Sequence, residues 1–159
     1  MFEIGEVVVY KREVCIIKEI KKNFHKNLDY YILNSIIDES LVLQVPIENK
    51  MGYLRKIMTP NEVENLIEKI PNIECIDTNE KFIENEYKTL LQTNEIDDLI
   101  KIIKTTYLRN HNRQKEGKKL ADKDSFFFNK AEKFLYTEIS KSLNMEYEDV
   151  KNYIIERLK

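Results

Sequence analysis

The first third of the chain carries short runs of β-branched and aromatic residues, separated by polar stretches of the kind that form turns. Their spacing leaves no room for crossover helices, so we expect an antiparallel meander. Four or five short strands usually curl into a small barrel, because closure removes exposed strand edges. The pattern predicts a small all-β barrel over residues 1–57, with four runs at Val7–Tyr10, Val14–Ile20, Tyr30–Ile37 and Leu41–Ile47.

From Thr59 onward, the hydrophobic positions follow a helical period. Thr59, Pro60 and Glu62 form a capping-box pattern, which predicts a first helix that runs to Ile70. The polar stretch Arg109–Lys119 is expected to be a loop between the third and fourth helices. We therefore predict an α+β chain in which an all-α bundle of five helices fills residues 58–159. The four later helices are expected over Asn79–Leu91, from Asn94 to about Tyr107, over Asp122–Leu143 and over Glu146–Leu158.

Composition excludes several classes of protein. The chain has 159 residues, of which only three are glycine, and it contains no glycine-rich phosphate-binding motif. Its two histidines, His25 and His111, have no Cys or His at ligand spacing, so we expect no metal and no other cofactor. Cys15 and Cys75 are expected to be reduced thiols, with a disulfide between them as the alternative. The absence of a signal-peptide pattern predicts a cytoplasmic location.

The charge is distributed unevenly along the chain. The formal net charge is only −2, but residues 1–58, 59–98, 99–135 and 136–159 carry +1, −8, +6 and −1 respectively. The basic block between residues 99 and 135 is either a solvated loop or a surface that contacts phosphates. A pI of about 5.8 argues against a protein that binds nucleic acid on its own. A DNA-binding role would therefore require a partner that delivers the chain to DNA.

The order of segments resembles that of the CarD/CdnL family of bacterial transcription regulators. The resemblance covers nearly the whole chain. It lies in the opening Phe2–Tyr10, in Leu41–Asn49 followed by Met51–Arg55, in Thr59–Ile70, and in Lys119–Asp124 with Lys130–Met145.

This resemblance implies a Tudor-like (SH3-like) barrel that docks on the lobe of the RNA polymerase β subunit. It also implies a helical domain that contacts promoter DNA at the upstream edge of the transcription bubble. Members of the family are not enzymes; they stabilise the open complex, partly with an aromatic wedge in the minor groove. Binding to polymerase makes the DNA contact effectively intramolecular, so that a modest basic patch suffices.

The resemblance and the basic block together give the candidate site residues. The polymerase-facing positions fall on Lys22, Asn23 and Gln44. The wedge of the family is a tryptophan, which this chain lacks, and the nearest aromatic residue is Phe82. Phe82 either replaces the wedge or, as the favoured interpretation, packs in the core beside Ile83. The candidate DNA-binding residues are Arg109, Arg113, Lys118, Lys119, Lys123, Lys81 and Phe82.

Two other functions remain open from the sequence. The chain could be a Tudor-like protein-binding adaptor that has lost DNA contact together with the tryptophan. It could also be an enzyme with a cleft between the two modules, although no catalytic pair stands out. We expect a regulator that is not an enzyme, that binds polymerase and promoter DNA, and that uses neither a membrane nor a small-molecule substrate.

Overall fold

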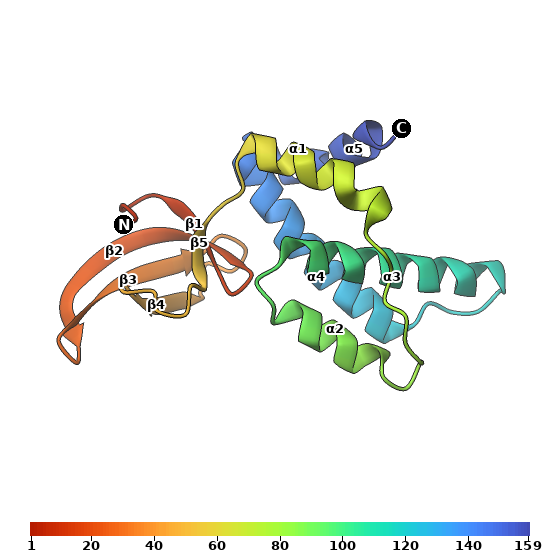
Figure 1. The fold of residues 1–159 in the computed structure, drawn as a ribbon, viewed down its shortest axis with the longest axis horizontal. Coiled ribbons are helices and arrows are strands. Elements are labelled where there is room, and N and C mark those ends of the chain that lie inside the picture. The colour runs from red at the N-terminus through yellow and green to blue at the C-terminus, as the bar shows by residue number, and fades with distance from the viewer.

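The structure, a computed structural model, describes residues 1–159. An antiparallel sheet of five strands comes first and five α-helices follow, so the α+β prediction is confirmed (Figure 1). The strands are β1 (Val7–Tyr10), β2 (Glu13–His25), β3 (Leu28–Ser35), β4 (Val42–Pro46) and β5 (Leu54–Lys56). The helices are α1 (Pro60–Lys69), α2 (Ile83–Leu91), α3 (Ile96–Lys115), α4 (Asp122–Leu143) and α5 (Tyr147–Arg157), with a 3₁₀ turn, η1 (Ile70–Asn72), after α1.

The sheet has the order β4-β3-β2-β1-β5, so that β1 to β4 form the expected meander and β5 returns to pair with β1. Strands β4 and β5 do not pair with each other, so the sheet is not closed and the predicted barrel is not confirmed. Two-residue turns join β1 to β2 at Lys11-Arg12 and β2 to β3 at Lys26-Asn27. All four of these turn residues have positive φ, as tight hairpins require.

Each module has its own hydrophobic core. The core of the sheet contains residues such as Val8, Ile17 and Leu33, whereas the helical core begins with Met58. Helix α4 contacts each of the other four helices and also β2, so it is the central element of the bundle. No helix combines the length and the apolar character that crossing a membrane requires.

Several boundaries differ from the sequence prediction: helix α2, for example, begins at Ile83 instead of Asn79. Strand β2 continues to His25 instead of ending at Ile20, and it forms a long hairpin with β3 that includes register shifts (Figure 1). Helix α3 continues to Lys115, so the expected loop from Arg109 is wrong over its first seven residues. Polar side chains at the start of this stretch bond to the N-terminal end of α4: Asn110, for example, donates to the Ser125 hydroxyl at 3.3 Å and accepts from the N–H of Ala121, the N-cap of α4, at 3.0 Å.

The capping box at the start of α1 is confirmed. The Thr59 side chain accepts from the Glu62 N–H at 3.1 Å, and the Glu62 carboxylate accepts from the Thr59 N–H at 3.1 Å. Pro60 occupies the first turn, where its missing N–H costs nothing. These contacts fix where the helical module starts, directly after β5.

Candidate functional site

A buried carboxylate on α4 lies at the centre of a group of predicted DNA-binding cations at one end of the helical module. Asp124 has no exposed surface. It accepts from Arg109 Nε at 3.2 and 3.0 Å, and from the Tyr87 hydroxyl at 2.7 Å. Burial, reinforced by the bond to Asp124, raises the pKa of Tyr87 well above its ordinary value. Arg109 of α3 is therefore held in one orientation, with its outer nitrogens turned toward the surface.

Three cations of this end converge on one carboxylate. Glu80, in the turn before α2, pairs with Lys123 at 2.8 Å and with Arg113 at 3.7 Å, and it also pairs with Arg109 Nη2. Hydrogen bonds from Lys123 and Arg109 lower the pKa of Glu80 to about 2. Glu80 is therefore ionised throughout the neutral range, and it balances part of the positive charge predicted for DNA contact.

The remaining lysines of the α3–α4 connection are exposed. Lys118 pairs with Glu116 at 2.9 Å in a contact open to water, and Lys119 makes no ion pair. The Lys118 N–H donates to the Arg113 carbonyl at 2.8 Å, which folds the connection back over the last turn of α3. Gly117, with a φ of 73°, supplies the left-handed residue that such a helix end favours. Lys118 and Lys119 lie outside the network of ion pairs that Glu80 makes with Arg109, Arg113 and Lys123.

The expectation that Phe82 packs in the core is wrong. Phe82 is 46% exposed, whereas the next residue, Ile83, is 1% exposed. Ile83 and Tyr87 are the buried residues of α2, one helical turn apart, and Phe82 at the N-cap lies off that face. The ammonium of Lys81 lies 5.6 Å from the centre of the Phe82 ring. Phe82 is thus an aromatic side chain that a partner can reach.

The structure brings all seven predicted DNA-binding residues to one end of the helical module. Lys81 and Phe82 follow Glu80 directly in the chain, and Glu80 contacts three of the other five residues. Lys118 and Lys119 belong to the connection that begins where α3 ends. This set, Lys81, Phe82, Arg109, Arg113, Lys118, Lys119 and Lys123, is called the basic end below.

The three predicted polymerase residues do not form a single surface. Lys22 pairs with Asp29 at 3.2 Å, and the Asn23 N–H donates to the same carboxylate at 2.8 Å, so both lie on the β2–β3 hairpin. Alternate residues of a strand share a face, so Asp29 lies on the same face of the sheet as Tyr31. Gln44 pairs with Ile32, the next residue of β3, and therefore lies on the opposite face. Sequence position alone did not show that the hairpin pair and Gln44 are on different faces.

The outer edge of β4 is open. Leu41 and Ile47, which flank this strand, direct backbone groups toward β3: the Leu41 carbonyl accepts from Ser35, and the Ile47 N–H donates to Asp29. Because these groups alternate along an antiparallel strand, the N–H and C=O groups of Val42 and Gln44 point away from the sheet. Pro46, at the end of β4, has no N–H and limits the length of this edge.

Two arginines that the sequence analysis missed join the modules. Arg12 is 5% exposed and lies in the β1–β2 turn. Its guanidinium donates four hydrogen bonds of 2.8–3.3 Å to the end of α2 and the residues that follow this helix. The acceptors are the carbonyls of Leu90, Leu91 and Glu95 and the hydroxyl of Thr93. Burial lowers the pKa of Arg12 to about 10, so the group remains charged at neutral pH.

The second arginine, Arg55 of β5, binds Glu138 of α4. Its two terminal nitrogens donate to the two carboxylate oxygens at 2.7 and 2.8 Å, and the Met58 N–H donates to the same carboxylate at 2.8 Å. Glu138 is 2% exposed. Bidentate arginine–carboxylate pairs restrict both distance and orientation. Together with Arg12, this contact holds the sheet in a fixed orientation on the helices.

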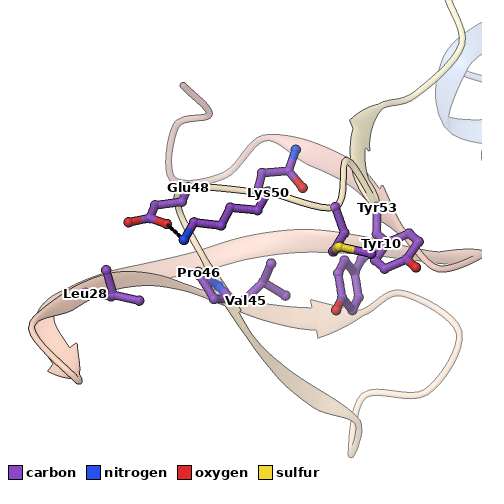
Figure 2. Close-up of a pocket in the computed structure, with 9 residues that line it drawn as sticks. Tyr10, Leu28, Val45, Pro46, Glu48, Lys50 and Tyr53 are labelled. Atoms are coloured by element: carbon purple, nitrogen blue, oxygen red, sulfur yellow. Dashed lines mark ion pairs between the residues drawn. The ribbon is translucent and has the colours of Figure 1, made fainter.

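A small pocket lies between β4 and the loop that leads to β5 (Figure 2). Its volume is about 200 Å³, and its lining includes Val45, Pro46, Tyr10 and Tyr53. The two tyrosine rings meet edge to face with centroids 6.5 Å apart. Glu48, Asn49 and Lys50 also line the pocket, and the Lys50 ammonium pairs with Glu48 at 3.4 Å. The loop thus forms one wall of this pocket.

The two thiols are free, as the sequence analysis expected. Cys15 is buried in the sheet, and burial raises its pKa to about 12, so it is a protonated core side chain. No group of three or more His, Cys, Asp or Glu side chains is placed to hold a metal ion. Comparison of the chain with known protein families and with characterised proteins gave no match.

Proposed function

We propose that this chain is a transcription regulator of the CarD/CdnL type, which binds the β-subunit lobe of RNA polymerase and promoter DNA at the same time. The N-terminal module acts as a Tudor-like docking module, and the helical module contacts DNA near the upstream edge of the transcription bubble. One observation carries the proposal: an open strand edge and the basic end lie on different modules, and Arg12 and Arg55 fix their relative orientation. A protein with that arrangement bridges two partners rather than transforming a substrate.

The basic end supports the DNA contact. Cations from the α2 turn, α3, the α3–α4 connection and α4 gather there, although the chain as a whole is slightly acidic. Lysine and arginine side chains in such a cluster release counterions from DNA phosphates, which gives an affinity that depends on salt and little on base sequence. Exposed Phe82 is the side chain available to unstack a base step, in place of the tryptophan of the family.

The sheet supports the polymerase contact. The unpaired backbone groups of Val42 and Gln44 on the open edge of β4 can accept a strand from a partner protein, a common mode of recognition. The strand order, with β5 returning to β1, is compatible with a Tudor-like module that a partner strand extends at β4. Docking there leaves the basic end free, because it lies on the other module.

Two observations favour the alternative function, a protein-binding adaptor without DNA contact. Glu80 pairs with three of the six predicted DNA-binding cations, and the wedge tryptophan is missing. An adaptor of this kind would keep the polymerase contact. Its basic end would make no salt-dependent contribution to the stability of polymerase–promoter complexes.

Charge reversal of Lys118 and Lys119, the two exposed lysines of the α3–α4 connection, distinguishes these functions. The double substitution Lys118→Glu and Lys119→Glu should weaken the stabilisation of polymerase–promoter complexes about tenfold or more, because it removes two phosphate contacts and adds repulsion. Lifetimes of open complexes after a heparin challenge, measured at several salt concentrations, check this prediction.

Retention on polymerase is the control for that double variant. Because the lysines lie on the helical module, polymerase should retain the variant as well as it retains the original chain. Unchanged lifetimes would show that the basic end does not contact DNA. Loss of retention would show that these lysines belong to the polymerase interface instead.

A further inference from the structure

Glu80 has an unusual combination of properties. Its side chain is 56% exposed, yet it pairs with three cations from two helices. Exposed ion pairs are individually weak, since water competes for both partners. The three pairs therefore hold Glu80 in place without burying it, and a competing anion from solution can reach the same cations.

The three cations are arranged around the carboxylate in a way that suits a phosphate. Arg113 and Lys123 approach one oxygen of Glu80, and Arg109 approaches the other. A phosphodiester also offers two charged oxygens, and arginine recognises such groups with parallel hydrogen bonds. Arg109 keeps its orientation whatever anion is bound, because its Nε is anchored by buried Asp124.

We propose that Arg109, Arg113 and Lys123 form a phosphate-binding site that Glu80 occupies internally, so that a nucleic-acid phosphate must displace this carboxylate in order to bind. This inference rests on the proposed function for the identity of the nucleic acid, but the phosphate site itself does not. The exchange replaces one anion by another at the same cations, which keeps the affinity for isolated DNA low. A high local concentration of DNA, as on a bound polymerase, overcomes the competition.

Displacement of Glu80 also affects its neighbours. Glu80 lies in a turn closed by a bond of 2.9 Å from the Phe82 N–H to the Asn79 carbonyl, directly before α2. When the carboxylate leaves the cations, this turn loses its ion pairs with α3 and α4. Lys81 and Phe82 are then free to follow the DNA, so phosphate binding and engagement of the exposed aromatic ring are coupled.

The substitution Glu80→Gln tests the proposal, with Glu84→Gln as the matched control. Glu84 is 53% exposed, lies four residues away, and its closest ion pair is with Lys88 at 4.0 Å, so its loss changes the net charge equally without touching the site. Two probes are titrated: inorganic phosphate, followed through the Nε–Hε NMR signals of Arg109 and Arg113, and a fluorescent duplex that ends in an open bubble.

Glu80→Gln should bind both probes about fivefold to tenfold more tightly than the original chain, and Glu84→Gln less than about twofold more tightly. Adding Arg113→Gln to Glu80→Gln should remove most of the gain. Equal effects of the two glutamate substitutions, or weaker binding by Glu80→Gln, would overturn the proposal. Tighter binding of phosphate with no binding of the bubble duplex by any variant, polymerase present or not, would support the phosphate site and contradict the proposed function.

Discussion

Replacing Glu138 with glutamine should lower the free energy of unfolding by about 3 kcal/mol, the largest single effect expected in this protein. The carboxylate is 2% exposed and accepts three hydrogen bonds, two from Arg55 and one from the Met58 N–H. Glutamine keeps the size of the side chain but loses the charge and one acceptor, which leaves the Arg55 guanidinium without its counterion. Urea unfolding should show a lower midpoint concentration of urea, while the slope of the unfolding free energy against urea concentration stays unchanged.

Glu68→Gln is the control for that measurement. Glu68 is an exposed residue of α1 that makes no ion pair, so its substitution should change stability by less than about 0.5 kcal/mol. If Glu138→Gln were as mild as Glu68→Gln, the Arg55–Glu138 contact would not hold the two modules together.

Arg12→Met should cost about 2 kcal/mol and should act locally on the end of α2. Methionine retains the apolar length of the arginine stem but leaves the Leu90, Leu91 and Glu95 carbonyls without their buried donor. The removal of a charge that is costly to bury offsets part of this loss, which is why the effect is smaller than that of Glu138→Gln. Hydrogen exchange of the backbone amides should become faster from Leu90 to Glu95. Urea unfolding measures the decrease in the free energy of unfolding of the whole chain.

Lys11→Met provides the comparison, because Lys11 belongs to the same turn, has the same sign of φ and carries the same charge. Its ammonium lies 4.9 Å from the centre of the Tyr53 ring in an exposed contact, so the substitution should cost less than about 1 kcal/mol. Equal losses from both substitutions would mean that the turn itself, rather than the arginine contacts, determines the effect.

Under the proposed function, these two contacts also affect activity, because they determine how the modules are oriented. A bridge between polymerase and DNA stabilises a promoter complex best when its two binding surfaces are already held at the required geometry, since less conformational freedom is then lost on binding. We therefore expect Arg12→Met and Glu138→Gln to reduce open-complex lifetimes while leaving retention on polymerase intact.

The main elements could be predicted from the sequence because their signals are local. The Thr59 capping box marks the start of α1, and the apolar stripe around Ala131 gives the limits of α4 as Asp122–Leu143. The sequence pattern did not predict those parts of the structure that depend on contacts between residues distant in the chain. Arg109 looked like part of a polar loop, but its bond to buried Asp124 keeps it within α3.

The sequence does contain a pattern that indicates the two buried carboxylates of α4. Asp124 and Glu138 each lie seven residues from Ala131, and therefore on the apolar face of α4, where a charged residue must find a buried partner. Their partners, Arg109 and Arg55, are 15 and 83 residues away. Sequence spacing shows that such partners are needed but not which residues they are. Arg12 gave no signal at all, because it lies in a short turn without periodicity.

Co-elution of the full chain with bacterial RNA polymerase core, or with an isolated fragment of the β-subunit lobe, tests the central claim most directly. The purified chain and each partner are mixed at micromolar concentration and separated by size-exclusion chromatography. The proposed function predicts a shared peak with the core enzyme and with the lobe fragment alone, since the proposed docking surface lies on the small N-terminal sheet. Separate elution from both would contradict the claim that this chain is a polymerase-bound regulator.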